Sequence, residues 1–353
     1  MLIMTGNITR RRFVQGLGAG AAVAGLAPRT GLIGQAEAAG GQVIVGTWGG
    51  DYQNLMDQYI AKPLMGPTGY QIVFDTGMDT ARKTKLLAEK PLPRGSMDVV
   101  ALTHSGSYEM WKNGTLLELD TKKIPNAVHI LDKLKTPYAV PHIYTGRVIL
   151  YNPKYVKEKP TSYNDLWNPA YNGKVGVIDI QYQTTIESAA MIAGGSLSNY
   201  EPGKAKLLEL KKQGVKIYPT NEAMASALKT EEVWMCIMWK ARGVMWQNAG
   251  IPIEMANPKE GIVLYVSDQV VAKNARNKDG AYAWVNALLD PSAQVQFARG
   301  MGYNPTVSNV EIPADLKARI DFPPDVIYLA QDQDYLAKND AALKDWWDKE
   351  FKA

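Results

Sequence analysis

The sequence contains few cysteines and few histidines. Cys236 is the only cysteine among 353 residues, which excludes an intramolecular disulfide, a lipid anchor on a cysteine and a cysteine-based zinc site. Cys236 lies in the apolar run 233–239, so we expect a buried structural thiol. The histidines are His104, His129 and His142. Three histidines are few for a metal or catalytic centre that is built on histidine.

Catalytic motifs are missing as well. The sequence has no H-E-x-x-H, no G-x-S-x-G, no G-x-x-x-x-G-K-[ST] and no EF-hand loop. No segment brings a nucleophile together with a base. We therefore expect a protein that is not an enzyme and that uses no cofactor.

A strong excess of one charge is also lacking. The chain has 39 Lys and Arg against 35 Asp and Glu, a net charge of +4. Residues 1–38 hold four Arg and one Glu, so the remainder has 39 − 4 = 35 basic and 35 − 1 = 34 acidic side chains. A net charge of +1 over so long a chain argues against a nucleic-acid partner.

Tyrosine and tryptophan are abundant instead. The chain has 18 Tyr and nine Trp against five Phe, within a composition that is 46% hydrophobic and 21% charged. Aromatic rings with a polar handle suit half-wet ligand clefts better than dry cores. The length suits two domains, each able to bury its own core.

The N-terminus resembles a twin-arginine export signal. Arg10, Arg11 and Arg12 precede a short apolar run that glycines interrupt, and Ala36-Glu37-Ala38 offers an A-x-A processing site. An N-terminal membrane anchor is the alternative, but the run is too short to cross roughly 30 Å of hydrocarbon. We expect a signal peptide at 1–38, export by the twin-arginine pathway, and a periplasmic protein without a stable membrane anchor.

Beyond residue 40, strand-like and helical segments alternate, which indicates an α/β architecture. Strands are expected at 43–47, 71–74, 98–102, 148–151, 175–178, 233–238 and 262–266. Helices are expected at 52–61, 80–88, 108–113, 204–213, 221–229, 280–289, 292–299 and 340–351. No flexible linker interrupts them, so two lobes would be joined by strands.

Seven motifs occur in a specific order: GTWGG, TGYQIVFDT, MDVVALTHSGSYEMWKNGTLLELD, YAVPHIYTGRVILYN, LWNPAYNGKVGVID, CIMWKARGVMWQNAGIPIEMANPKEG and VVAKNARNKDGAYAWVNALLDP. In this order the chain after the leader resembles the spermidine/putrescine-binding proteins, the periplasmic solute-binding subunits of ABC importers. The resemblance implies a two-lobed α/β fold with hinge strands and a ligand cleft between the lobes. Lobe one would comprise 40–151 plus 266–309, and lobe two 152–265 plus 310–353. It also implies a monomer whose partners are a small-molecule ligand and the permease subunits.

The family clamps its ligand between aromatic faces, and the matching positions here keep them. Trp48, Trp239, Tyr265 and Tyr303 occupy those positions. Cation–π attraction to such rings favours a ligand cation. Ordinary core packing is the alternative for each of the four.

The acidic positions of the polyamine binders differ. An ungapped alignment places Ile180, Gln183 and Ser267 where those proteins have carboxylates. Asp179 and Asp268 lie one residue away, and neighbours in an extended strand point to opposite faces. The cage for ammonium groups is therefore expected to be absent.

Basic side chains stand in the same motifs. Arg147, Lys240 and Arg242 are candidates for holding a carboxylate, although Lys240 and Arg242 would also fit a solvated helix start. His104 and His142 could contact a ligand or a metal, or could serve as neutral hydrogen-bonding groups. The full set of expected ligand-binding residues is Trp48, Gly49, Thr103, His104, Ser105, Tyr144, Arg147, Gln183, Trp239, Arg242, Tyr265, Ser267 and Tyr303.

These observations favour a receptor that delivers a small polar ligand to an ABC permease. A buried arginine requires an anionic partner to offset its desolvation, so a carboxylate-bearing amino acid, sugar acid or opine-like conjugate fits Arg147 best. The alternative ligand is a true polyamine, putrescine or spermidine. From another class, a periplasmic enzyme on the same scaffold is a remote alternative.

Overall fold

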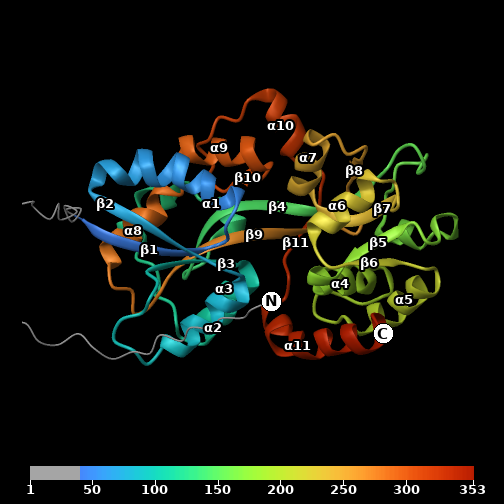
Figure 1. Ribbon diagram of the computed structural model, residues 1–353, viewed down its shortest axis with the longest axis horizontal. Coiled ribbons are helices and arrows are strands. Elements are labelled where there is room, and N and C mark those ends of the chain that lie inside the picture. Colours follow the sequence, from blue (N-terminus) through green and yellow to red (C-terminus); the bar gives the residue numbers. More distant parts are fainter. Residues whose placement is uncertain (1–39) are drawn as a thin grey trace, which may run out of the picture. The chain divides into compact units, whose positions relative to one another are not determined.

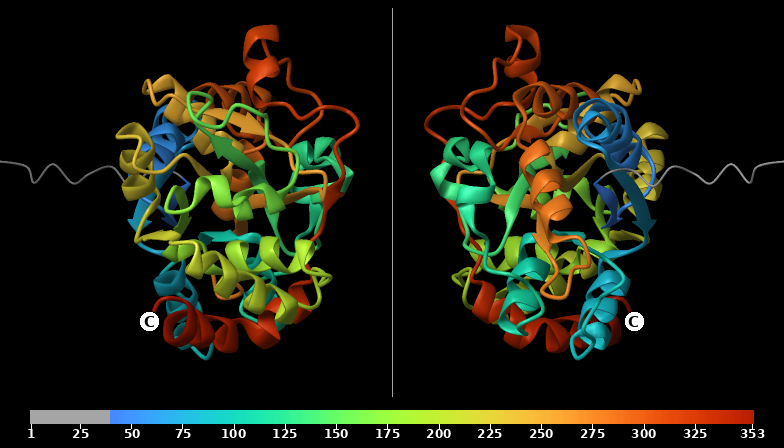
Figure 2. Two further views of the ribbon diagram at one scale, coloured as in Figure 1. Left: turned by 90° about the vertical axis from the view of Figure 1, so that its right-hand side faces the viewer. Right: turned by 90° about the vertical axis from the view of Figure 1, so that its left-hand side faces the viewer.

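A mixed β-sheet with helices packed against it organises the chain (Figure 1). The computed structural model describes residues 40–353, so the predicted signal peptide and its processing site lie outside the described residues. Within these residues the α/β fold class is confirmed. The turned views show helices on both sides of the strands (Figure 2).

The first part of the sheet has the order β2-β1-β3-β9-β4. Strand β1 (Gly41–Thr47) pairs in parallel with β2 (Tyr70–Thr76) and β3 (Val99–Thr103). Strand β9 (Ile262–Val271) is antiparallel to β3 and to β4 (Val140–Tyr151). Two-residue strands add at the margin, because β10 (Asn304–Pro305) pairs with β4 and β11 (Tyr328–Leu329) with β9.

The second part continues from β4 in the order β4-β7-β5-β6. It contains β5 (Val175–Ile178), β6 (Lys216–Tyr218) and β7 (Met235–Trp239), and β8 (Glu254–Ala256) also pairs with β4. All twelve residues of β4 are buried. Strands β4 and β9 therefore run through the middle of the sheet and join its two parts.

The α-helices connect these strands. They are α1 (Asp51–Met56), α2 (Asp79–Glu89), α3 (His104–Lys112), α4 (Tyr182–Ile192), α5 (Glu201–Lys212), α6 (Asn221–Lys229), α7 (Lys240–Asn248), α8 (Lys278–Ala287), α9 (Pro291–Met301), α10 (Ala314–Ile320) and α11 (Gln333–Trp346). A π-helical segment (Asp57–Met65) extends α1, and another (Trp347–Phe351) extends α11.

Each part of the sheet has its own hydrophobic core. Residues of 43–144 and 266–307, together with Ala241, form one cluster, which includes the fully buried Trp284 and Phe297. Residues of 148–262 and 336–351 form two further clusters, one of them around Tyr163 and Trp347. Burial of such large side chains is the main favourable contribution to folding.

The expected strands are all present, and β1, β2, β4 and β9 are longer than predicted, the last two by the most. Strand β4 begins eight residues earlier than expected and β9 ends five residues later. Both extensions carry buried polar side chains, among them His142 and Gln269, which hide the strand from a hydrophobicity pattern. Cys236 is buried in β7 as predicted, and burial raises the pKa of its thiol to about 12.

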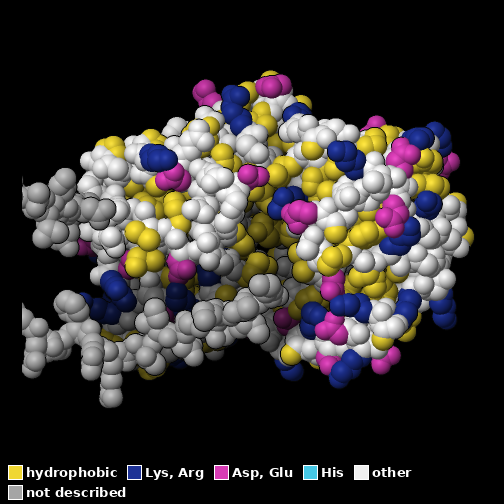
Figure 3. Space-filling model, viewed as in Figure 1, with side chains coloured by type: hydrophobic (Ala, Val, Ile, Leu, Met, Phe, Trp, Pro, Cys, Tyr) yellow, Lys and Arg dark blue, Asp and Glu magenta, His cyan; other side chains and the backbone are white. Residues whose placement is uncertain are grey.

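Helices α4, α7 and α10 were not expected. Seven consecutive residues of α4 are buried, so this helix lacks the polar face on which a 3.6-residue pattern depends. None of the helices in 40–353 is long and apolar enough to span a membrane. On the face in Figure 3 basic and acidic side chains are interspersed, and hydrophobic side chains line a central hollow.

Candidate ligand-binding cleft

Two adjoining cavities lie where the two parts of the sheet meet. The larger has a volume of about 520 Å³ and the smaller of about 170 Å³, and both are lined by Thr103, Ile180, Trp239 and Tyr265. We call the two cavities together the cleft. A small molecule fits such a volume.

Most of the expected ligand-binding residues line the cleft. They are Trp48, Gly49, Thr103, His104, Ser105, Arg147, Gln183, Trp239, Arg242, Tyr265, Ser267 and Tyr303. The structure does not bring Tyr144 into either cavity: its side chain is buried in β4, and the Lys133 ammonium lies 4.8 Å from its ring centre.

Strand ends and helix starts place these side chains. Thr103 and Ser267 face each other across β3 and β9, and Arg147 and Trp239 across β4 and β7. The cleft is also lined by the N-cap residues of α1, α2, α3, α4 and α7, namely Gly50, Met78, Thr103, Gln181 and Trp239, and by Asn221, the first residue of α6. Helix N-termini carry free N–H groups and a partial positive charge, so this wall favours anionic groups.

Aromatic rings form much of the cleft wall. The ring of Trp239 lies 4.7 Å from that of Tyr265, and Tyr265 lies 6.1 Å from Tyr303. On the other side Trp48 packs edge-on against Tyr52, and the guanidinium of Arg82 covers one face of Trp48 at 4.4 Å. These contacts fix the rings without removing them from the cavity.

A buried hydrogen-bond network supports the larger cavity. The Tyr52 hydroxyl contacts His142 Nδ1 at 2.7 Å and the Ser267 hydroxyl at 3.3 Å, and it accepts a hydrogen bond from Gln269. Burial lowers the pKa of His142 to about 3, so this imidazole is neutral. His142 lies behind Tyr52 and lines neither cavity. It acts here as a neutral hydrogen-bonding group.

His104 lines the smaller cavity and is paired with a carboxylate. Its Nδ1 lies 2.9 Å from Asp268, whose side chain is 1% exposed. Burial alone would lower the pKa of His104, but the charge of Asp268 and the hydrogen bond to it raise that pKa above its ordinary value. Asp268 itself does not line the cleft. Its carboxylate therefore interacts with His104 rather than with the cavity.

Arg147 also has a carboxylate partner inside the protein. It donates a hydrogen bond of 2.5 Å to Glu187 of α4, and the two side chains are 6% and 0% exposed. Tyr200 and Gln331 donate to the other oxygen of Glu187. The argument that Arg147 needs the anion of a ligand was therefore wrong, because Glu187 already supplies the anion.

Arg242 is different, because it lines the larger cavity without an ion pair among residues 40–353. Its Nε is buried and has no hydrogen-bond partner in that part of the chain. Burial raises the pKa of Tyr303, and the positive charge of Arg242 offsets part of that rise. The positive charge of Arg242 therefore interacts with the hydroxyl of Tyr303 in the aromatic wall of the cleft.

Lys240 does not face the cleft. It donates to the backbone carbonyl of Asp321, and its ammonium lies 4.7 Å from the ring centre of Phe322. Residues two positions apart on a helix point about 200° from each other, so Lys240 and Arg242 face opposite sides of α7. Of these two candidates, only Arg242 lines the cleft.

Two carboxylates line the larger cavity. Asp51 lies in the first turn of α1 and Glu222 in the first turn of α6, and both are exposed. Asp179 is engaged elsewhere, by Trp347 and Lys352. The exposed Ile180 lines the cleft beside it.

Several lining residues were not anticipated. They include Tyr52, Met78, Ile143, Gln181, Thr184, Asn221, Glu222, Met301 and Gln331. Thr220, which caps α6, directly precedes Asn221 and Glu222, and this capping pattern is visible in the sequence. Gln181 and Thr184 belong to the start of α4, which the sequence did not reveal. Residues 40–353 contain no group of three or more His, Cys, Asp or Glu side chains that could hold a metal ion.

Comparison with known proteins agrees with this geometry. Residues 59–324 match the model of the family "Bacterial extracellular solute-binding protein". The Escherichia coli (strain K12) spermidine/putrescine-binding periplasmic protein is 28% identical over 247 residues, which cover 67% of this chain and 70% of that protein. An ABC transporter structure from Clostridium perfringens has a TM-score of 0.75 and 24% identity, covering 87% of this chain and 99% of that one. The Atu4243-GABA receptor has a TM-score of 0.76 and 20% identity, covering 88% and 98%.

The fold and the cleft define a two-lobed periplasmic solute-binding protein. The chain belongs to the family of bacterial extracellular solute-binding proteins. In sequence it is similar to polyamine-binding proteins, and the family it belongs to binds solutes.

Proposed function

We propose that this receptor binds a small amino acid or related carboxylate and that Arg242 holds the carboxylate. The observation that carries the proposal is the position of Arg242, whose guanidinium lines the larger cavity with a buried, unpartnered Nε and without an ion pair among residues 40–353. Guanidinium presents a planar pair of donors that matches a carboxylate. A carboxylate in the cavity would accept hydrogen bonds from the terminal N–H groups of this guanidinium and offset the desolvation of the charge.

The other charges of the cleft support the same assignment. Arg147 is neutralised by Glu187 and His104 is paired with Asp268, so neither adds an unpaired charge. The helix N-termini around the cleft favour an anion. Arg242 is therefore the anchor rather than Arg147.

The remaining groups suit the rest of such a ligand. Asp51 and Glu222 line the same cavity and can receive an ammonium group. The faces of Trp239, Tyr265 and Tyr303 can cover its methylene groups. An amino acid carries all three kinds of group.

Polyamine binding is the second candidate. It is supported by the E. coli relative, which is a spermidine/putrescine-binding protein, and by the two carboxylates at Asp51 and Glu222. Against it stands Arg242, because a second cation in the same cavity would repel a diamine unless an anion accompanies it.

A thermal-shift screen divides the two candidates. The panel contains amino acids with carboxylates at different distances from the ammonium group, sugar acids, opine-like conjugates, putrescine and spermidine. A ligand at a hundred times its Kd stabilises the folded state by about 2.7 kcal/mol. We expect stabilisation by a carboxylate that is lost in Arg242→Gln. Stabilisation by putrescine or spermidine alone, undisturbed by Arg242→Gln, would overturn the proposal.

The proposal includes closure about β4 and β9. Lobe one would comprise 40–151 plus 266–309 and lobe two 152–265 plus 310–353, a division supported by the separate cores of the two parts of the sheet. Two-lobed receptors of this kind close by a hinge rotation. We expect the radius of gyration in small-angle scattering to fall when a carboxylate that stabilises the protein is added, and an unchanged radius at saturation would contradict closure.

The proposal also includes export and partners. The TRRRFVQ segment supports export by the twin-arginine pathway with cleavage after Ala38. The released chain would be a monomer in the periplasm that delivers its ligand to permease subunits. Replacing Arg10, Arg11 and Arg12 by Lys should retain the protein in the cytoplasm as an uncleaved precursor, which a fractionation blot detects. Normal export of that variant would contradict this route.

A further inference from the structure

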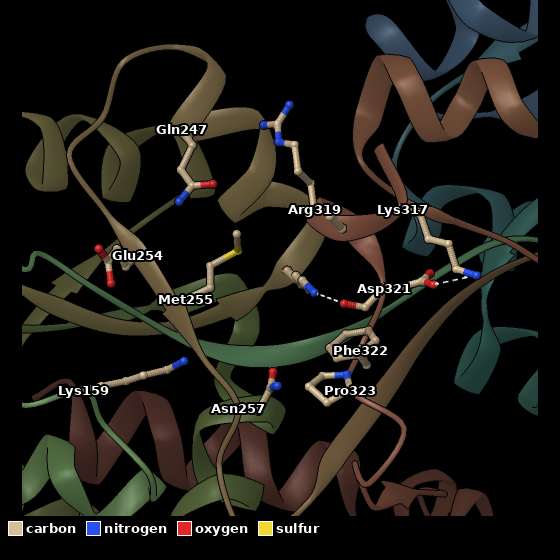
Figure 4. Close-up of a pocket in the computed structure, with 12 residues that line it drawn as sticks. Lys159, Gln247, Glu254, Met255, Asn257, Lys317, Arg319, Asp321, Phe322 and Pro323 are labelled. Carbon is tan, nitrogen blue, oxygen red and sulfur yellow. Dashed lines mark hydrogen bonds and ion pairs between the residues drawn. The ribbon is translucent and has the colours of Figure 1, made fainter. Parts of the chain in front are cut away.

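Another pocket lies outside the cleft. It has a volume of about 660 Å³, and we call it the outer pocket (Figure 4). The residues that line it are Lys159, Lys240, Gln247, Glu254, Met255, Asn257, Lys317, Ala318, Arg319, Asp321, Phe322 and Pro323. They come from the coil before β5, from α7 and β8, and from α10 with the segment that follows it.

Positive charge is concentrated in the outer pocket. Four basic and two acidic side chains line it, in a chain whose charges otherwise nearly cancel. The acids are already engaged, because Glu254 accepts a 2.6 Å hydrogen bond from Tyr151 and Asp321 lies 4.0 Å from Lys317. Four positive and two negative side chains leave the lining with a net charge of 4 − 2 = +2, and Lys159, Lys240 and Arg319 make no ion pair in the described part of the chain.

Lys240 is the most informative of these cations. Its residue exposure is 9%, and it has no ion pair among residues 40–353. Its ammonium donates to one carbonyl, that of Asp321, although it has three N–H donors. Burial lowers the pKa of Lys240 to about 8. The nearby Asp321 carboxylate offsets only part of that shift, and an anion bound beside Lys240 would further offset the cost of its burial.

The other donors have free capacity and reach the pocket from different sides. Lys159 is exposed, makes no ion pair in the described part of the chain, and extends into the pocket from the side opposite Arg319 (Figure 4). Arg319 donates one hydrogen bond, of 2.5 Å, to Asn248, which leaves most of its N–H donors available. Asn257 adds an amide to the same wall.

We propose that the outer pocket binds a small anion that carries several charged oxygens, such as a phosphate ester or a polycarboxylate. The buried Lys240 contacts this anion with its ammonium group, and the exposed Lys159 and Arg319 contact it with their charged groups. Cations on three separate elements match a ligand with several anionic groups better than a single compact ion. Phe322 and Met255 provide an apolar surface for its carbon atoms. This site is independent of the cleft and of the ligand proposed for it.

The test is a calorimetric titration of the full chain with inorganic pyrophosphate at about 0.1 M salt. We expect one-to-one binding that Lys240→Met and Lys159→Met each weaken by at least tenfold. Methionine keeps the length and the apolar contacts of the lysine stem, so Phe322 stays covered. Lys338→Met, which removes an exposed lysine of α11, is the matched control and should bind as the wild type does.

Arg242→Gln separates the outer pocket from the cleft. This variant should bind pyrophosphate normally, because Arg242 lines the cleft and not the outer pocket. If Lys240→Met fails to fold, as circular dichroism would reveal, the exposed Lys159 alone decides. Three results would each overturn the proposal: no binding by the wild type, binding that the pocket variants retain, or binding that only Arg242→Gln abolishes.

Discussion

Arg147 donates to Glu187 over 2.5 Å at the wall of the smaller cavity, and both charges are buried. The pair joins β4, which both parts of the sheet share, to α4 of the second part. Its charge is balanced within the chain. Arg147 is therefore a structural member of the cleft wall, and Arg242 is the residue that we propose for anion binding.

This pair predicts an asymmetry in stability. Arg147→Met leaves Glu187 as an uncompensated buried carboxylate, which should cost about 3–5 kcal/mol of the free energy of unfolding. The double variant Arg147→Met with Glu187→Met removes both charges and should recover most of that loss. Urea denaturation of the three proteins measures this. Equal losses in Arg147→Met and in the double variant would show that the carboxylate left without its partner is not what destabilises Arg147→Met.

The aromatic wall predicts a loss of affinity without a loss of fold. Trp48 and Trp239 line the larger cavity and are only partly buried. Replacing either by Ala should weaken the binding of a carboxylate found in the screen by at least tenfold, about 1.4 kcal/mol. Trp346→Ala, on α11 away from the cleft, is the matched control. Normal binding by both cleft variants would identify these rings as packing residues.

Ile180 predicts a change of ligand preference. Its side chain is 56% exposed and lines both cavities. The ungapped alignment predicts a carboxylate of the polyamine binders at this position. Ile180→Asp adds a negative charge to the cleft, so putrescine should bind at least tenfold more tightly than to the wild type. Ile180→Asn has nearly the same shape without the charge and serves as the control. Equal putrescine affinity in the two variants would contradict this reading of the site.

His142 predicts part of the acid sensitivity. Its pKa is about 3 in the folded protein against about 6.5 in an unfolded chain, so only the unfolded state gains a proton between these values. Its contribution to stability is complete above pH 6.5 and is lost as the pH falls, by about 1.4 kcal/mol per pH unit. His142→Gln should lack this contribution to the pH dependence of the unfolding free energy, whereas His129→Gln should retain it. Urea unfolding at pH 7 and pH 5 gives the comparison, and an unchanged slope in His142→Gln would refute it.

The sequence revealed the fold more fully than the site. Strands such as β5 and helices such as α6 have clear patterns, and their predicted ranges match the structure. The partner of Arg147 was not predictable, because Glu187 lies forty residues away on a helix without a polar face. Lys240 and Arg242 looked equivalent until the position of the helix start placed them on opposite sides of α7.

Calorimetry with two ligands that differ at one end tests whether Arg242 selects a ligand carboxylate. 4-Aminobutanoate and putrescine have the same chain length and share an ammonium end, but one ends in a carboxylate and the other in a second ammonium. We predict that the wild type binds 4-aminobutanoate at least tenfold more tightly than putrescine and that Arg242→Gln abolishes this preference. If the wild type binds putrescine more tightly than 4-aminobutanoate, and Arg242→Gln leaves the ratio of the two affinities unchanged, Arg242 does not select a carboxylate.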